Sequence, residues 1–189
     1  MKTTNIMIVG VGGQGSLLAS KLLGNLLLDQ GYDVKVSEVH GMSQRGGSVV
    51  TYVKFGERVY SPIIDRCEAD FIVAFEGLEA ARYVPNLAQG GRFIVNTQQI
   101  DPMPVITGAA EYPVDIIDRL QDSLSNVDAI DALALAKEAG SVKAVNMVLM
   151  GRLSKYMSIP EEKWIDAIKK SVAPKFTQMN IKAFTLGRK

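Results

Sequence analysis

The fold is decided by residues 6–15, Ile6-Met7-Ile8-Val9-Gly10-Val11-Gly12-Gly13-Gln14-Gly15. The first four residues are a short apolar run with β-branched side chains, which is typical of a strand buried on both faces. Gly10, Gly12 and Gly15 then match G-x-G-x-x-G, in which glycines permit a tight turn, a close backbone approach to a phosphate and close packing of helix on strand. Leucines recur at helical spacing over residues 16–30. The stretch therefore predicts a strand, a glycine turn and a helix.

The turn is also a candidate binding site, because backbone N–H groups at the start of a helix favour an anion. We expect Gly10, Gly12, Gly13, Gln14 and Gly15 to face a nucleotide or another phosphate-bearing ligand. In the alternative interpretation the glycines serve only the passage from strand to helix.

A second glycine-rich loop follows a predicted strand at residues 34–36. Residues 39–47 read Val39-His40-Gly41-Met42-Ser43-Gln44-Arg45-Gly46-Gly47. Neighbouring parallel strands bring their carboxyl ends to one edge of a sheet, so we expect the two loops to form one site. Ser43, Gln44 and Arg45 are its candidate side chains, because Arg45 can contact a phosphate or carboxylate with two hydrogen bonds.

Glu38 keeps two alternatives open. It lies close to the position of the ribose-binding acid in a dinucleotide fold, which keeps NAD as a possible cofactor. It is also a potential partner for Arg45, in which case the second loop is only an exposed connection. His40 is the sole histidine, and we interpret it as a structural or phosphate-contacting imidazole rather than a metal ligand.

The rest of the chain predicts an α/β fold, Rossmann-like and doubly wound, with a mostly parallel sheet. Alternation over residues 48–55 and a turn at Gly56-Glu57 predict an inserted β-hairpin whose second strand is 58–60. The final third is predicted to be helical. There Ser158 is the expected N-cap and Glu161 its reciprocal partner.

Both glycine loops carry a resemblance to a known family. Gly-x-Gly-Gly-Gln-Gly near the start of the chain, with Glu38-x-His40 and residues 41–47, resembles the gamma subunit or domain of the 2-oxoacid:ferredoxin oxidoreductases. The resemblance extends over nearly the whole chain and is strongest to the small beta subunit of indolepyruvate:ferredoxin oxidoreductases. It implies that residues 1–189 form a single gamma-type domain.

The resemblance also implies a reaction and a set of partners. The assembled enzyme is expected to convert an aryl 2-oxoacid such as indolepyruvate to an acyl-CoA by oxidative decarboxylation and to pass electrons to ferredoxin. Thiamine diphosphate, Mg2+ and the 4Fe-4S clusters are expected in a larger partner subunit, through which ferredoxin is reached. For this chain the resemblance implies a cover over the active site and a contribution to binding the phosphates of coenzyme A, the co-substrate. No catalytic residue is assigned to it.

Composition limits the other classes of function. A formal net charge of +1 gives no basic field for nucleic acid. Cys67 is the single cysteine, which excludes an internal disulfide and a cysteine-ligated iron–sulfur cluster. No apolar run reaches the ~20 residues that span a bilayer, and no secretory leader is recognisable before the first strand, so we expect no membrane contact and a cytoplasmic location.

Three interpretations remain open. The first is the inactive-alone oxidoreductase subunit, whose apolar, methionine-containing helices around residues 144–157 are expected to supply the partner interface. The second is a stand-alone NAD-dependent dehydrogenase that uses Gly10 to Gly15 and Glu38. The third is a nucleotide-binding assembly module without chemistry.

Overall fold

The computed structural model of the chain describes residues 3–40 and 46–189. In the described part, six strands alternate with eight α-helices and three short 3-10 turns. The strands are β1 (Thr4–Val11), β2 (Asp33–His40), β3 (Ser48–Gly56), β4 (Ala69–Ala74), β5 (Leu87–Asn96) and β6 (Val127–Ile130). The helices are α1 (Ser16–Asp29), α2 (Gly77–Tyr83), α3 (Met103–Ile106), α4 (Ile116–Ser123), α5 (Ala132–Ala139), α6 (Val145–Ser154), α7 (Glu161–Ser171) and α8 (Thr177–Arg188). The 3-10 turns are η1 (Val84–Asn86), η2 (Val142–Ala144) and η3 (Pro174–Phe176).

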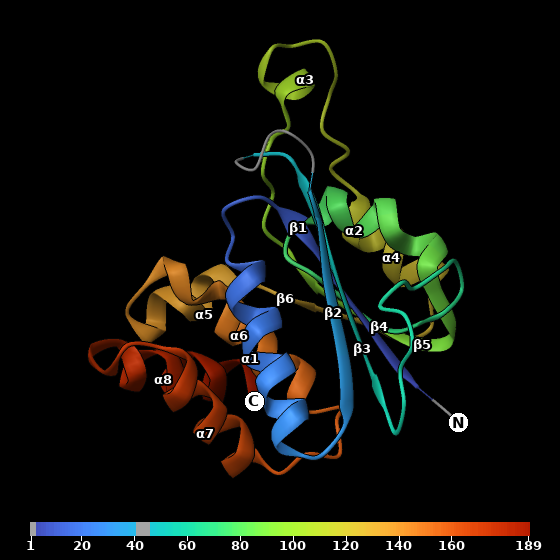
Figure 1. Cartoon of the computed structure of the whole chain (residues 1–189). Helices are drawn as coiled ribbons and strands as arrows, with labels where there is room; N and C mark the ends of the chain where they lie inside the picture. Colours follow the sequence, from blue (N-terminus) through green and yellow to red (C-terminus); the bar gives the residue numbers. More distant parts are fainter. Residues whose placement is uncertain (1–2, 41–45) are drawn as a thin grey trace.

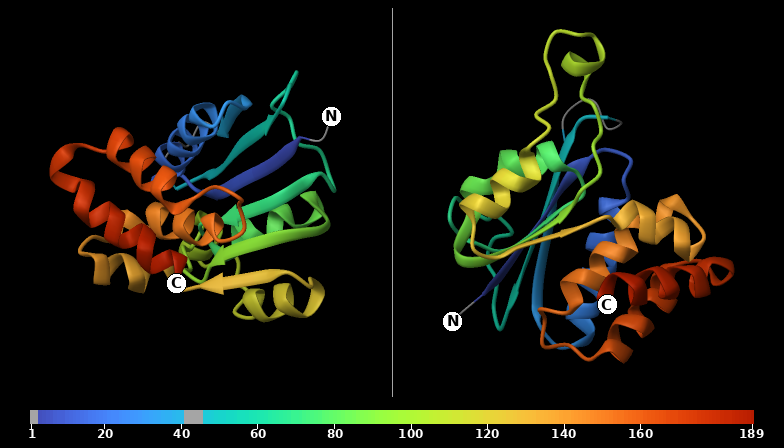
Figure 2. Two further views of the ribbon diagram at one scale, coloured as in Figure 1. Left: turned by 90° about the horizontal axis from the view of Figure 1, so that it is seen from below. Right: turned by 180° about the vertical axis from the view of Figure 1, so that it is seen from behind.

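The sheet lies between two layers of helices (Figures 1 and 2). Successive residues of β1 point to opposite faces, so Ile6 and Ile8 pack against α1, α5, α6, α7 and α8, whereas Met7 and Val9 pack with residues of α2 and α4. All four side chains are fully buried. This burial on both faces explains why the strand reads as a continuous apolar run, and it confirms the predicted α/β fold.

The strand order is β2-β3-β1-β4-β5-β6. β1, β4, β5 and β6 pair in parallel, as the prediction required. β3 runs antiparallel to both of its neighbours, with Val53 opposite Ile6 of β1 and opposite Val36 of β2. β1 and β2 therefore point the same way, and both of their carboxyl ends lie at one edge of the sheet.

Two details of the predicted sheet were wrong. The hairpin partner of β3 is β2 rather than residues 58–60, which form no strand; there the Val59 N–H donates to Asp33 Oδ2 at 2.8 Å. β1 and β2 are consequently not neighbours, because β3 lies between them. Alternation along β3 identified the strand, but its partners depend on tertiary pairing that a local pattern does not contain.

The helical final third is confirmed, with one cap placed differently. α7 begins at Glu161 with Pro160 as its N-cap residue, and no side chain caps it. Ser158 therefore lies too far before the helix to cap it. Glu161 occupies the first helical position instead of the third, and its carboxylate pairs with the Arg188 guanidinium at 3.1 Å.

The methionine-containing helix does not supply the predicted interface. Met147 and Met150 of α6 are fully buried, because α6 lies between the sheet and α8. Trp164 of α7 is also fully buried, and its ring stacks on that of Phe184 with centroids 5.7 Å apart. These side chains belong to the core, so any partner surface has to be sought elsewhere.

No helix in the described part of the chain combines the length and the apolar character needed to cross a membrane.

Candidate functional site

The glycine turn after β1 has the backbone geometry that only glycine adopts without strain. Gly13 and Gly15 have φ angles of 103° and 88°. Gly10 is required for a different reason, since a Cβ atom there would lie 2.9 Å from both the Phe75 Cβ atom and Gln14 Oε1. The turn therefore presses against the end of β4 before the chain enters α1.

The side chain of Gln14 holds this turn from within. Gln14 Oε1 accepts a hydrogen bond from the Val11 N–H at 2.8 Å, and Gln14 Nε2 donates to the Phe75 carbonyl at 3.0 Å. Both ends of the amide are engaged with main chain. Gln14 thus positions the loop, and its predicted contact with a phosphate-bearing ligand stays a prediction.

α1 presents an uncapped N-terminus at the turn. Its N-cap residue is Gly15, which has no side chain to accept the first N–H groups, and no acidic residue lies in its first turn. The first N–H groups of a helix have no partners inside the helix and carry partial positive charge. This end of α1 has the unpaired N–H donors that the predicted phosphate contact requires.

Asn146 of α6 supports the glycine turn at Gly15. The sequence analysis assigned this residue no role. Its side chain is only 3% exposed, and Asn146 Nδ2 donates to the Gly15 carbonyl at 3.3 Å. A Cβ atom on Gly15 would lie 2.8 Å from the same nitrogen. The sequence signal that could have identified this role is the position of a polar residue, Asn146, within the apolar stretch 144–157.

The end of the second loop lies against the first. The Gly12 N–H donates to the Gly47 carbonyl at 2.8 Å, and the Gly46 N–H donates to the Gly12 carbonyl at 3.2 Å. This reciprocal pair of bonds brings the two loops together at the carboxyl edge of the sheet. Ser43, Gln44 and Arg45, the predicted side chains of the second loop, lie outside the described residues.

One pocket lies between the turn and β2. It has a volume of about 450 Å³. Its lining residues are Gly12, Gly13, Gly15, Ser16, Leu17, Glu38, His40 and Val49. Glu38 and His40 are thus placed beside the glycine turn. The Glu38 carboxylate gives this side of the turn a group suited to hydroxyl or amine donors and repulsive to an anion.

A second pocket lies on the other side of the turn and has a volume of about 580 Å³. The glycine turn, Gln98 and residues 142–146 contribute to its wall. Lys143 supplies its cation, held in place by η2, whose N-cap Ser141 Oγ accepts the Lys143 N–H at 3.2 Å. The sequence interpretation missed Lys143 because nothing local links it to the turn. An anionic group therefore fits this side better than the Glu38 side.

The described residues offer no ligand set for a metal ion or an iron–sulfur cluster. Residues 3–40 and 46–189 contain no cluster of three or more histidine, cysteine, aspartate or glutamate side chains that could hold a metal ion. Cys67, the only cysteine of the chain, is exposed. A cysteine-ligated iron–sulfur cluster has no place on this chain.

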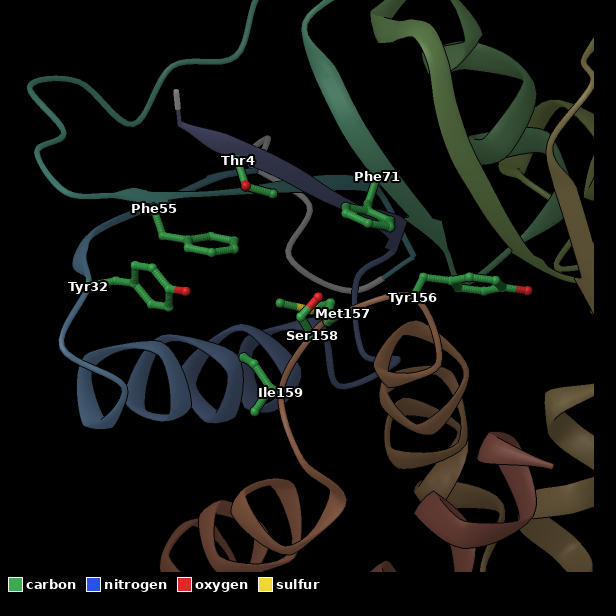
Figure 3. Close-up of a pocket in the computed structure, with 8 residues that line it drawn as sticks. All are labelled: Thr4, Tyr32, Phe55, Phe71, Tyr156, Met157, Ser158 and Ile159. Atoms are coloured by element: carbon green, nitrogen blue, oxygen red, sulfur yellow. The ribbon is translucent and has the colours of Figure 1, made fainter. Parts of the chain in front are cut away.

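A third pocket, at the opposite edge of the sheet, differs in chemistry (Figure 3). It has a volume of about 220 Å³ and is lined mainly by rings and apolar side chains, among them Tyr32, Phe55 and Phe71. The rings of Tyr32 and Phe55 meet edge to face with centroids 5.1 Å apart. This third pocket lacks the convergent backbone donors of the glycine turn, so the candidate site lies at the carboxyl edge of the sheet.

Comparison with known proteins identifies the family of the chain. Residues 5–189 match the family described as pyruvate ferredoxin/flavodoxin oxidoreductase. The chain is 46% identical to the indolepyruvate oxidoreductase subunit IorB of Thermococcus kodakarensis, over all of this chain and 96% of that protein. It is 39% identical to the subunit of the same name from Archaeoglobus fulgidus, over 97% of this chain and 92% of that one.

Solved structures share the fold at lower identity. The pyruvate oxidoreductase subunit PORC of Thermotoga maritima superposes with a TM-score of 0.74 at 19% identity, over 99% of this chain and 96% of that chain. A 2-oxoglutarate:ferredoxin oxidoreductase chain from Magnetococcus marinus gives 0.75 at 21% identity, with all of this chain covering 31% of that one. Because the family match spans residues 5–189 and the 46% identical relative is aligned with the whole chain, the chain belongs to the pyruvate ferredoxin/flavodoxin oxidoreductase family.

Proposed function

We propose that the chain is the small subunit of an indolepyruvate or related aryl 2-oxoacid:ferredoxin oxidoreductase, and that its glycine turn binds phosphate groups of coenzyme A. The identity of 46% over the whole chain to a subunit of that name supports the reaction class. The relatives are matched along 92% of their length or more, so the likeness is not confined to one motif. We further propose that residues 1–189 act as one gamma-type domain.

The observation that carries the phosphate site is the convergence of backbone donors and a cation at a fixed glycine turn. The uncapped start of α1 supplies N–H groups, the paired loops keep Gly12 and Gly46 together, and Lys143 supplies a cation on the open side of the turn. Backbone donors and a cation are the groups that proteins use to bind phosphate. Arg45 of the second loop is proposed to add a bidentate contact.

The chemical steps are proposed to take place in the larger subunit. Thiamine diphosphate would supply the carbanion chemistry of decarboxylation there, and 4Fe-4S clusters would carry electrons to ferredoxin. This chain's own residues bind and orient the co-substrate and shield the reaction from water. The isolated chain is accordingly expected to be inactive.

The proposal is tested by the coenzyme A dependence of the reconstituted enzyme. Charge-assisted hydrogen bonds contribute roughly 1.5–3 kcal/mol each, so Arg45→Ala should raise the apparent KM for coenzyme A by about 10- to 100-fold. Lys143→Ala should raise it by about 10-fold, because a lysine at an open pocket is better hydrated. Arg45→Lys should rescue only part of the loss, since a point charge does not reproduce two parallel hydrogen bonds.

Lys163→Ala is the matched control. Lys163 is exposed on α7 and lines none of the three pockets described above, so its removal changes the net charge equally without touching the site. Normal assembly of Arg45→Ala and Lys143→Ala with unchanged KM and kcat would show that both loops are structural.

Glu38 supports one alternative function, the NAD-dependent dehydrogenase. Its carboxylate lines the pocket next to the glycine turn, where a ribose-binding acid would be needed. NAD(H) titrated into the isolated chain separates the two proposals. Binding together with dehydrogenase activity of the chain alone would favour the alternative.

A further inference from the structure

The described chain exposes large apolar side chains on one projecting element. Residues 97–115 connect β5 to α4 and carry α3 at their tip; we call them the arm. Met103, Ile106 and Val114 are 66%, 65% and 94% exposed. None of residues 97–115 is buried. Figures 1 and 2 show the arm standing out beyond the carboxyl edge of the sheet, away from both helical layers.

The tip of the arm is ordered by its own backbone. The Thr107 N–H donates to the Met103 carbonyl at 2.9 Å, and the Ala109 N–H donates to the Pro104 carbonyl at 2.8 Å. Gly108 adopts a left-handed φ of 74° that turns the chain back. Met103 and Ile106 are therefore displayed on a preformed turn, which lowers the entropy lost on binding, and Val114 lies on the returning segment just before α4.

A buried carboxylate fixes both roots of the arm to the start of α2. Glu76 is 1% exposed, and its Oε1 atom accepts the Ile100 N–H at 3.3 Å and the Tyr112 hydroxyl. The Tyr112 oxygen in turn accepts the Leu78 N–H at 3.1 Å. Burial, followed by the adjacent Glu76 carboxylate, raises the pKa of Tyr112, so its hydroxyl stays a donor. The clamp therefore holds both roots of the arm at fixed positions beside α2.

The charge and position of the arm indicate what covers it. Its only ionisable acids and bases apart from Tyr112 are Asp101, Glu111 and Asp115. Asp115, at the root, pairs with Arg119 of α4 at 3.1 Å, so Asp101 and Glu111 give the arm its acidic character. Gln98 at its root lines the pocket that also contains the glycine turn and Lys143. A partner seated on the arm would therefore also close the proposed coenzyme A site.

We propose that the arm docks this chain on the larger subunit of the enzyme, with Met103, Ile106 and Val114 inserted in an apolar groove that has a basic rim. The proposal rests on the proposed function, because a co-substrate held at the turn must face the chain that carries the reaction.

The test measures binding of the purified chain to the purified larger subunit. A triple variant, Met103→Ser with Ile106→Ser and Val114→Ser, should weaken the Kd by about 100-fold or more, because central apolar anchors dominate interface affinity. It should unfold at the same denaturant concentration as the wild type, since none of the three side chains is buried. The matched control is Leu28→Ser with Tyr60→Ser, at 56% and 86% exposure outside the arm, and it should bind like the wild type.

Two further variants examine the clamp and the charge. Tyr112→Phe removes the hydroxyl that ties one root to Glu76 and leaves the three anchors, so it should weaken binding by about 10-fold. Asp101→Asn with Glu111→Gln should slow association and reduce its dependence on salt. A triple variant that binds within about threefold of the wild type would overturn the proposal, as would an equal loss in the control.

The outcome is separable from that of the coenzyme A site. Loss of binding in the triple variant, with Lys143→Ala and Arg45→Ala leaving coenzyme A kinetics unchanged, would support the arm and refute the phosphate site. Intact binding of the triple variant, with altered coenzyme A kinetics in the other two, would refute the arm and keep the site.

Discussion

Two glycines at the crossing of α6 and α8 allow the sharpest stability prediction. A Cβ atom on Gly151 of α6 would lie 2.0 Å from the Phe184 carbonyl oxygen, and one on Gly187 of α8 would lie 2.0 Å from the Val148 carbonyl oxygen. The two backbones thus approach at reciprocal points. Carbon–oxygen contacts below 3.0 Å do not occur, so alanine at either position forces the helices apart by about 1 Å.

Gly151→Ala should destabilise the chain by roughly 2 kcal/mol. Overpacking against rigid backbone costs roughly 1–3 kcal/mol and sometimes more, and here it also disturbs the stacking of Phe184 on Trp164. Alanine recovers about 1 kcal/mol through its higher helix propensity. The close contact is with main chain, which has no other rotamer to adopt, so we expect an overpacking cost of about 3 kcal/mol. After the gain in helix propensity, a net loss of about 2 kcal/mol remains.

Gly24→Ala in α1 is the matched control, because the same replacement there should have the opposite sign. A Cβ atom on Gly24 would meet only the Val36 Cγ2 atom at 3.5 Å, an ordinary contact. We expect stabilisation of about 0.5–1 kcal/mol from helix propensity. Urea unfolding of the purified variants measures both changes. Similar unfolding free energies for Gly151→Ala and Gly24→Ala would refute the reasoning.

Asp128→Asn should cost roughly 2–4 kcal/mol at neutral pH, because it leaves the Arg152 guanidinium without the carboxylate that binds it at 2.7 Å. Burial opposes ionisation of Asp128, but hydrogen bonds from Arg152 and Tyr156 outweigh it and lower the pKa. The carboxylate therefore stabilises the fold fully above its ordinary pKa of 3.8, and this stabilisation is lost as the pH falls through the lowered pKa. In urea unfolding, the free energies of unfolding of wild type and variant should start to converge below about pH 4. A constant difference down to pH 2 would contradict this. Gln14→Ala should lower the free energy of unfolding by roughly 1–3 kcal/mol, because both hydrogen bonds of the side chain are lost. Gln14→Glu should recover part of this loss, because its carboxylate accepts from the Val11 N–H but cannot donate to the Phe75 carbonyl. Equal unfolding midpoints for Gln14→Ala and wild type would contradict the supporting role.

The first βα unit was predictable from local rules alone. An apolar β-branched run, three spaced glycines and a leucine-rich helical pattern occur in order, and each of them restricts the same short segment. The structure has β1, the turn and α1 where these patterns placed them. The place of β3 was not predictable in this way. Its alternating side chains fit either neighbour, and the choice depends on strand pairing across the whole sheet.

The candidate site was predictable only where it is local. The glycine turn could be found because its spacing is itself the requirement for the backbone. Lys143 and Asn146 reach the turn through the packing of η2 and α6, far along the chain, and Lys143 has no neighbour in sequence that would mark it. Pro102, Pro104 and Pro113 mark the arm in the sequence as a stretch that interrupts long helices and strands. Its exposed apolar tip was missed because exposure depends on the body from which it projects.

The insertion of β3 decides how the two glycine loops are used. In an ordinary dinucleotide fold the second strand lies beside the first, about 4.8 Å away, and its terminal acid reaches the ribose. Here β3 separates them, so Glu38 belongs to a strand about twice as far from β1. The same insertion makes residues 41–47 the connection between antiparallel strands and brings Gly46 and Gly47 back onto Gly12. The topology thus places the acid two strands from β1, across a pocket from the glycine turn, and fastens the second loop to that turn, which favours a phosphate-binding turn over an NAD site.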